Sequence, residues 1–192
     1  MNPTDQQEEP DFELIAATAA GGSAAFEALY ARYERRVFRY VCTFVRQPAL
    51  AEEVVIDTMM AVWKGARDFN RDSRASTWIL GIARHKALDA VRKTRNEAAT
   101  ASVEQAAEIA DTAEAPVESI NHADQAQLML RAISQLSPDH QEILRLAFYE
   151  ELPYADISAL LSIPDSTVKT RVFYAKQQLR GHLEKMGVGG TP

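Results

Sequence analysis

The chain has few residues that could cross-link it or hold a metal ion. Its 192 residues include a single cysteine, Cys42, so no disulfide can form within it and no cysteine-based zinc site can be assembled. The apolar, helical surroundings of Cys42 predict a small buried side chain. No glycine-rich phosphate loop follows a strand, and the histidines lack partners at metal-ligand spacing. We therefore expect no catalytic site, no cofactor and no metal. The histidines are His85, His122, His140 and His182.

Glycine and proline are also scarce, at 8 residues each, and runs of β-branched residues are short. This composition predicts an all-α protein, and 192 residues are enough for one domain or two small ones. The chain has no long apolar run, and its first residues are acidic with no basic stretch. We therefore expect no membrane span, no signal peptide and a cytoplasmic location.

Positive charge is missing from two parts of the chain. Residues 1–29 and residues 96–121 each contain six acidic side chains and no Lys or Arg, whereas residues 32–95 contain 14 Lys and Arg against 7 Asp and Glu. The formal net charge is −6. Because local fields govern binding more than the total charge does, this acidic total does not exclude a partner such as DNA.

Apolar periodicity divides the chain into two helical blocks. The first contains a helix capped by Ser23, a second at about 49–65 and a third at about 75–94, with a polar, basic loop at 66–76. The second block contains four helices. The predicted parts are an acidic N-terminal segment at 1–22, a first domain at 23–95, an acidic flexible linker at 96–121, a second domain at 122–186 and a disordered tail at 187–192.

The linker sets how far apart the two domains can act. As 26 residues of coil it would average about 28 Å from end to end. Fully extended, it would reach about 86 Å. It could therefore tie together two domains that lie more than one turn of DNA apart, a turn being about 34 Å.

Residues 151–176 predict two short helices joined by a tight turn. Pro153 suits a first helical position, where its missing N–H costs little. Ile157, Leu160 and Leu161 fall at i, i+3 and i+4 and give the first helix one apolar face. Pro164 ends that helix, because the residue before a proline is pushed out of the α region.

The second helix of this pair is basic. Asp165 or Ser166 is expected to cap it, and Val168, Val172 and Ala175 give it an inward face. Two such helices predict a helix-turn-helix, which places side chains in a DNA major groove. An ordinary antiparallel helix pair with a solvated basic face is the alternative. The basic residues are Lys169, Arg171, Lys176 and Arg180.

Two blocks of the chain resemble one known family. Residues 50–63 and 76–92 look like region 2 of the bacterial sigma-70 family, and residues 136–146 with the helix-turn-helix look like region 4. Nothing between them resembles region 3, so the chain is similar to the small extracytoplasmic-function (ECF) sigma factors. The resemblance implies a non-enzymatic factor in which RNA polymerase carries the chemistry.

The resemblance implies a docking surface for core RNA polymerase. Glu52, Glu53 and Asp57 match the acidic positions of the family helix that binds a polymerase coiled coil, where carboxylates could meet basic side chains. A solvated acidic helix face is the alternative. Ile56 departs from the family, which commonly has a polar residue at this position.

The resemblance also implies that the loop 67–76 and the helix after it bind the −10 element. Flipped bases need a polar pocket with cationic walls, and phosphates need basic partners. Trp78 could stack on a base, although its apolar setting favours a place in the core. His85 stands where the family usually has Asn. A solvated loop is the alternative. The implied residues are Asn70, Arg71, Asp72, Ser73, Arg74, Arg84, His85, Lys86, Arg92 and Lys93.

In region 4 the start of the second helix of the pair is expected to read the −35 element. Tyr174 replaces a frequently basic residue, and Ser162 stands where the turn usually has Gly. If Ser162 adopts a positive φ, it costs about 1 kcal/mol relative to Gly. The implied residues are Ser166, Thr167, Lys169, Thr170, Arg171, Tyr174 and Lys176.

The implied function is bacterial transcription initiation in a stress response, with promoter recognition and melting of the −10 region. The implied partners are core RNA polymerase, promoter DNA and an anti-sigma factor, with no small-molecule substrate. Acidic side chains of the linker could mimic nucleic acid in a basic channel, or could only keep a tether soluble. Two other hypotheses are a sigma-like mimic that binds only an anti-sigma protein and a stand-alone helix-turn-helix repressor. The first lacks the expected receiver domain, and the second leaves the first 95 residues unexplained.

Overall fold

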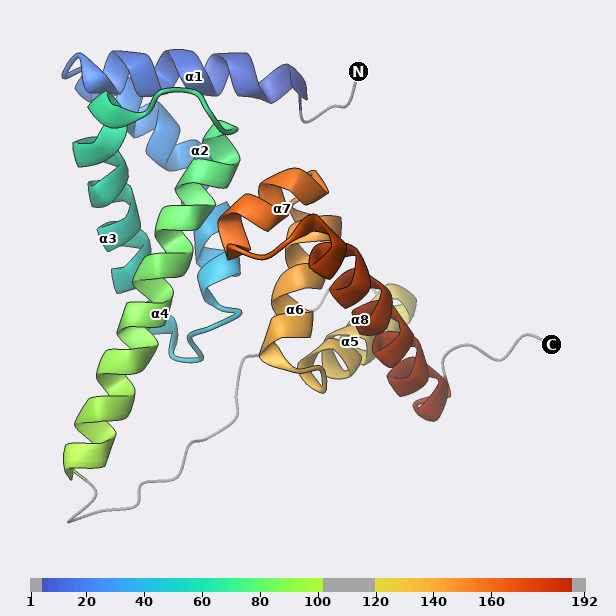
Figure 1. The fold of residues 1–192 in the computed structure, drawn as a ribbon. Coiled ribbons are helices and arrows are strands. Elements are labelled where there is room, and N and C mark those ends of the chain that lie inside the picture. Colours follow the sequence, from blue (N-terminus) through green and yellow to red (C-terminus); the bar gives the residue numbers. More distant parts are fainter. Residues whose placement is uncertain (1–4, 102–119, 188–192) are drawn as a thin grey trace.

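The computed structural model describes the backbone of residues 5–101 and 120–187, and side chains within 9–97 and 126–187. Every regular element in these ranges is a helix, which confirms the all-α prediction for the described residues (Figure 1). The helices form two parts. The first contains α1 to α4, and the second contains α5 to α8.

The acidic N-terminal segment forms a helix of its own, α1 (Asp5–Ala19), which lies across the end of the next three helices (Figure 1). Gly21 has a φ of 91°, and a Cβ on Gly22 would lie 2.9 Å from the carbonyl oxygen of Ala17. This pair of glycines therefore permits the tight turn into α2 (Ser23–Val41). The prediction that Ser23 caps α2 is wrong, because Gly22 occupies the N-cap and Ser23 is already helical.

Helices α2, α3 (Pro48–Gly65) and α4 (Ala75–Ala101) pack together around the first part of the core. The apolar stripe of α2 is buried as its periodicity predicts. A short 3-10 turn, η1 (Ala66–Asp68), and an irregular loop connect α3 to α4. The buried stripe of α2 consists of Leu29, Tyr33, Val37, Tyr40 and Val41.

The linker predicted at 96–121 is partly helical. Helix α4 continues to Ala101, and α5 (Ile120–Ser134) begins two residues before the predicted second domain. The good helix formers just after residue 95 extend α4 without needing an apolar face of their own. Residues 102–119 and 188–192, which hold most of the predicted linker and tail, lie outside the described residues.

The second part is built from α5, α6 (Pro138–Leu144), the π-helical turn η2 (Arg145–Tyr149), α7 (Tyr154–Leu161) and α8 (Asp165–Lys185). Ser137 caps α6 by accepting a hydrogen bond from the His140 amide, as its position before Pro138 suggests. Helices α7 and α8 form the predicted helix-turn-helix, with Ser162 between them in the left-handed region at a φ of 54°.

Three local predictions in the second and first parts need correction. Pro153 and Pro164 are the N-cap residues of α7 and α8, so Pro153 precedes its helix and neither Asp165 nor Ser166 is a cap. A proline with an extended ψ ends the preceding segment and begins the helix at the same time. Cys42 is exposed rather than buried, and it lies just past the last residue of α2, Val41, where the helical burial pattern ends.

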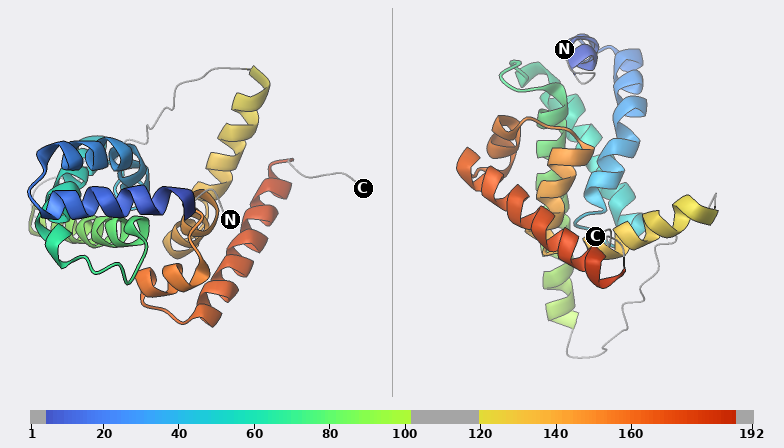
Figure 2. Two further views of the ribbon diagram at one scale, coloured as in Figure 1. Left: turned by 90° about the horizontal axis from the view of Figure 1, so that it is seen from above. Right: turned by 90° about the vertical axis from the view of Figure 1, so that its right-hand side faces the viewer.

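The two parts lie against each other, with α7 beside α4 (Figures 1 and 2). Buried residues of α2 and α4 form one continuous cluster with those of α6, α7 and α8. Contacts between residues about 100 positions apart in the sequence therefore decide which surfaces of each part are open.

Candidate nucleic-acid interface

Helix α3 separates an acidic face from an apolar one. Glu52, Glu53 and Asp57 are exposed, as are Ile56 and Met60, at 54% and 45%. The opposite face is buried against the core. Because the buried face fixes the rotation of the helix, the carboxylates point into solvent, where a basic partner could reach them. The buried residues are Ala51, Val54, Val55, Thr58, Met59 and Val62.

The loop between η1 and α4 has a local polar structure. The Asn70 side-chain amide donates to the Asp72 carboxylate over 2.5 Å, and the Asp72 amide donates to the Asn70 side chain over 3.3 Å. Arg71 lies between them with a φ of 63°, in the left-handed region. Asn70, Arg71 and Asp72 are exposed and Ser73 is half-buried, so this part of the predicted −10 set forms one open surface.

Helix α1 holds this loop in place. The Arg71 guanidinium lies 4.9 Å from the ring centre of Phe12 and 3.7 Å from Glu9. Phe12 stacks on Phe69, whose ring lies 4.7 Å from that of Trp78. Trp78 is thus part of an aromatic stack beneath the loop, as the core interpretation favours.

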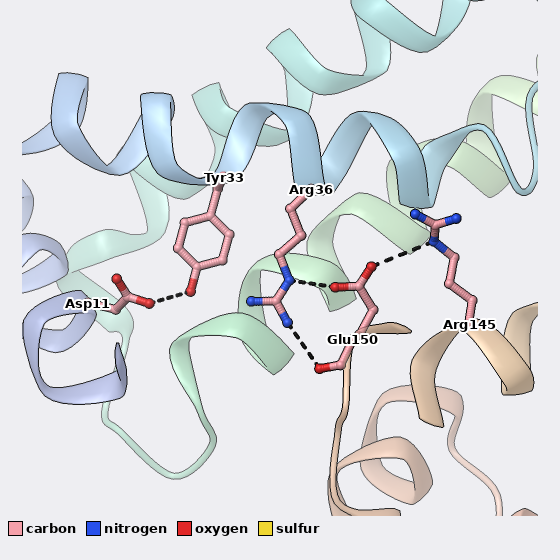
Figure 3. Close-up of polar contacts among 5 residues, drawn as sticks. All are labelled: Asp11, Tyr33, Arg36, Arg145 and Glu150. Carbon is pink, nitrogen blue, oxygen red and sulfur yellow. Dashed lines mark hydrogen bonds and ion pairs between the residues drawn. The ribbon is translucent and has the colours of Figure 1, made fainter. Parts of the chain in front are cut away.

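The contribution of Phe12 and Phe69 to the support of the loop was not predicted from the sequence. Phe12 could have been noticed in the sequence because it is an aromatic residue within an otherwise acidic segment. The segment itself is anchored by Asp11, which is 3% exposed and accepts a 2.6 Å hydrogen bond from the Tyr33 hydroxyl (Figure 3). Asp11 also pairs with Arg32.

The remaining −10 candidates do not share one surface. His85, Arg92 and Lys93 are exposed on α4 and make only local pairs with Asp89 or Glu97, at 3.3–4.0 Å. Such exposed pairs contribute little and leave the side chains available. Lys86 is half-buried on the same helix.

Arg74 and Arg84 face the second part of the molecule instead. The Arg84 Nε donates to Glu142 over 2.8 Å, and Arg74 lies 3.6 Å from Asp156. Burial of Arg84 alone would lower its pKa, but the hydrogen bond and charge of Glu142 raise it. Arg84 therefore stays charged within a contact that DNA would have to replace.

Helix α8 presents one polar face. Val168, Val172 and Ala175 are buried, as predicted, and their burial directs the opposite side outward. Thr167 and Arg171 are half-buried, and Arg171 pairs with Asp139 at 3.1 Å. The exposed members of the predicted −35 set are Ser166, Lys169, Thr170, Tyr174 and Lys176.

Phe173 belongs to the same outward face and was not identified from the sequence. It is 63% exposed, and its ring meets that of Tyr174 edge to face at 5.5 Å. The sequence could have placed Phe173 on this face, because it follows Thr170 by three residues and residues three apart are neighbours on a helix. The face can offer hydroxyls, cations and an apolar ring to base edges and phosphates.

The described residues contain no group of three or more His, Cys, Asp or Glu side chains arranged to hold a metal ion. None of the described helices combines the length and the apolar character needed to cross a membrane.

Comparison with known proteins gives two family matches at the positions of the two parts. The Sigma-70 region 2 family matches residues 29–97, and the Sigma-70, region 4 family matches residues 126–179. The RNA polymerase sigma factor CarQ of Myxococcus xanthus is 33% identical over 167 residues, which cover 85% of this chain and 94% of CarQ. The ECF RNA polymerase sigma factor SigK of Mycobacterium sp. (strain KMS) is 30% identical over 160 residues, 83% of each protein.

A solved structure has the same fold. The sigma factor RpoE of Bartonella quintana, crystallised with the anti-sigma factor NepR, superposes with a TM-score of 0.67 at 23% identity. The match covers 83% of this chain and 96% of that one. The similarity in fold therefore covers both helical parts together, whereas each family match covers only one of them.

Proposed function

This chain belongs to the ECF sigma factors of the sigma-70 family, which are non-enzymatic factors of transcription initiation, and we propose that three of its surfaces bind different partners during initiation. Helix α3 docks on core RNA polymerase, the loop after η1 binds the −10 element, and α8 binds the −35 element. The observation that carries this assignment is the separation of an exposed acidic face on α3 from basic and polar faces on the loop, α4 and α8.

The acidic face of α3 fits a basic protein surface better than it fits DNA. Glu53 and Asp57 lie four residues apart on the exposed side of the helix. Both would be repelled by phosphates and attracted by Lys or Arg on a partner helix. The exposed Ile56 and Met60 lie on the same side and supply an apolar centre for that contact.

The loop after η1 suits unpaired bases of a melted −10 element. It offers amide, carboxylate and guanidinium groups at Asn70, Arg71 and Asp72, which can pair with the exposed edges of a flipped base. The aromatic stack of Phe12, Phe69 and Trp78 beneath it keeps the loop in place. The cations of α4 would then follow the phosphates.

Helix α8 suits duplex DNA, since the helix-turn-helix presents the start of its second helix to a major groove. Lys169 and Thr170 are exposed near that start, and Phe173 can contact a thymine methyl group. Arg171 would exchange its pairing with Asp139 for a base or phosphate.

An anti-sigma factor is the third proposed partner. The structurally similar RpoE of Bartonella quintana was solved with the anti-sigma factor NepR. A protein that covers α3 here would block polymerase by competing for the same carboxylates. Such a partner would be identified as a protein that co-purifies with this chain and prevents its binding to core polymerase.

Runoff transcription with core polymerase on a promoter library tests the proposal. The double variant Glu53→Lys and Asp57→Lys should lose core binding and transcription, because like charges then face a basic partner, at a cost of several kcal/mol. The matched control is Glu13→Lys with Glu27→Lys, which reverses two exposed carboxylates elsewhere in the first part. Equal core affinity in the two double variants would remove α3 as the docking helix. Specific DNA binding without any core-dependent transcription would favour a repressor instead.

A further inference from the structure

Helix α1 contacts three alternate residues of η1 and the loop that follows it. Arg67 Nε donates a 3.1 Å hydrogen bond to the Ala19 carbonyl. Phe69 stacks on Phe12 with ring centres 5.8 Å apart, and the Arg71 guanidinium lies 4.9 Å from the centre of the same Phe12 ring. Because these contacts join segments about 50 residues apart, the course of the loop is set by α1 and not by its own sequence.

The rotation of α1 is fixed by the side chains that it buries. Asp11, Ile15 and Thr18 follow one another at i, i+4 and i+7, and all three are buried. Figure 3 shows Asp11 bound to the hydroxyl of Tyr33 from α2. A buried carboxylate is costly to separate from its partners, so this face cannot turn freely. Phe12 follows Asp11 directly and is therefore directed to the side of the helix along which the loop passes.

The backbone of Arg71 is strained, and α1 supplies the contacts that maintain it. Its φ is 63°, in the left-handed region that is unfavourable for side chains other than Gly. Such a conformation persists only where the surroundings determine it, and it recurs at ligand-binding sites. Here the ring of Phe12 faces the guanidinium, and the Glu9 carboxylate lies 3.7 Å from its Nη1 atom. The Arg71 side chain is thus held at a defined place on an exposed loop.

This arrangement leaves donor groups of Arg71 available. Stacking on Phe12 uses the flat face of the guanidinium, whereas its N–H donors lie in the plane of the group. The Arg71 side chain remains 51% exposed. A planar fork of donors can pair with two acceptors of one base at the same time. The orientation of the fork therefore decides which base it accepts.

We propose that α1 determines part of the sequence preference at the −10 element. Phe12 is a positioning residue, which acts through Arg71 and Phe69 and does not itself contact DNA. This inference rests on the proposed function for the role of the loop. It extends that function to residues 5–19, for which the acidic composition alone indicated no binding surface.

A positioning role differs from a purely structural one in what its loss changes. Loss of a structural contact lowers the fraction of active protein and weakens binding to every −10 sequence alike. Loss of orientation instead lowers the preference for one base over another at the positions that Arg71 contacts. The ratio of two affinities reports this difference, because it does not depend on the fraction of active protein.

Phe12→Leu separates the two roles. It keeps an apolar side chain next to Phe69 but removes the ring that faces Arg71. Phe12→Tyr retains the ring and should restore wild-type behaviour. Phe26→Leu is the matched control, because Phe26 is also a half-buried aromatic residue of the first part, and its ring contacts Trp63 of α3 and not the loop. Circular dichroism and thermal unfolding of each full-length variant measure any loss of fold.

The experiment uses each chain bound to core polymerase. Affinities are compared on premelted templates that differ at one −10 position at a time, so that melting does not enter the comparison. Phe12→Leu should reduce the ratio of affinities for the best and worst base roughly fivefold or more at one or two positions, which is the discrimination that a paired arginine supplies. Phe12→Tyr and Phe26→Leu should keep the wild-type ratio at every position.

Combination with Arg71→Gln tests whether Phe12 acts through this arginine. Arg71→Gln alone should remove the same preference. Addition of Phe12→Leu should then change the ratios no further, because residues that act through one another have non-additive effects. Wild-type ratios in Phe12→Leu would overturn the proposal, and so would independent, additive losses in the double variant.

The same templates distinguish a failure of this inference from a failure of the proposed function. Replacement of Asn70 and Asp72 by Ala should change the preference, because the loop is proposed to bind the −10 bases. A change in that variant, together with wild-type ratios in Phe12→Leu, would reject only the role of α1. Wild-type ratios in both variants would reject the proposed role of the loop as well.

Discussion

At the scale of single residues, backbone strain is found in the turns that position two of the proposed DNA-binding surfaces. Arg71, Glu151 and Ser162 are the non-glycine residues with positive φ in the described part of the chain. Arg71 lies in the loop that we propose binds the −10 element, and Ser162 lies in the turn of the helix-turn-helix. Side chains other than Gly are disfavoured there by about 1 kcal/mol or more, so the surrounding packing maintains both turns.

Replacement of Ser162 by Gly should stabilise the protein. Ser162 is exposed and has a φ of 54°, so Gly relieves strain and removes no buried contact. The free energy of unfolding, measured in urea, should rise by up to about 1 kcal/mol. Part of the gain is offset because an unfolded chain with Gly has more conformational entropy than one with Ser. Ser134→Gly, in the last turn of α5, should instead destabilise the fold. A loss of stability in Ser162→Gly would show that its hydroxyl makes a contact that the turn needs.

At the scale of elements, α3 and α8 follow the same principle. Each buries one apolar stripe, and this burial fixes which side chains face a partner. The irregular loop before α4 has no such stripe. It is positioned by α1 through the Phe12–Phe69 stack and by a hydrogen bond of 3.1 Å from Arg67 to the Ala19 carbonyl.

Replacement of Asn70, Arg71 and Asp72 by Ala should impair melting of duplex promoters. A template with a premelted −10 bubble should rescue the variant in part, because unpairing costs a few kcal/mol that the protein must otherwise offset. Permanganate reactivity of thymines near the start site measures the melting. Wild-type reactivity in the triple variant would mean that the loop is a solvated connector and that the helix beginning near Trp78 melts the DNA.

Substitutions in α8 should separate base contacts from phosphate contacts. Lys169→Ala and Arg171→Ala should each weaken −35 recognition while core binding is unchanged. A lost base contact costs about 1–3 kcal/mol at one position, whereas a lost phosphate contact weakens binding to all sequences alike. Arg180→Ala is the control, because this exposed residue of α8 pairs with Glu184. Normal transcription by both variants at limiting concentrations would place the recognition surface elsewhere.

At the scale of the whole molecule, the contact between the two parts changes the environment of Tyr40. Burial, and then the Glu142 carboxylate, hold the pKa of this phenol well above its ordinary value of 10.0. The folded, closed chain therefore binds the phenolic proton more tightly than the unfolded chain does. The stability gained in this way is complete below pH 10 and is lost as the pH rises toward the raised pKa.

The alkaline loss of stability should depend on Tyr40. Tyr40→Phe should lower the free energy of unfolding at neutral pH by about 1–3 kcal/mol, because Glu142 loses a hydrogen bond. Between pH 9 and pH 11 the stability of the variant should then fall less steeply than that of wild type. Tyr30→Phe, at a half-buried residue of the same helix, is the control. Parallel pH profiles for Tyr40→Phe and wild type would contradict this assignment.

Local pattern was sufficient for much of the fold and for two of the surfaces. The 3.6-residue period predicted the buried faces of α2 and α8, and the spacing around Pro164 predicted the helix-turn-helix. The acidic residues of α3 were predicted from the resemblance to region 2 of the sigma-70 family, because the apolar residues of this helix did not indicate one clear face in the sequence. Cap residues were predicted less well, since Gly22 and Pro164 replaced the expected Ser23 and Asp165 or Ser166.

The amino-acid sequence by itself determined the helices after the acidic N-terminal segment, the inward faces of α2 and α8, and the family to which the chain belongs. These depend on residues within a few turns of one another, so periodicity and motif spacing record them. Only the tertiary structure decided that Asp11 is buried beside Tyr33, and that Arg84 binds Glu142 and not solvent. These partners are 22 and 58 residues apart in the chain. Their pairing depends on how amphipathic helices pack, and a charged residue has the same local pattern whether it faces water or a buried partner.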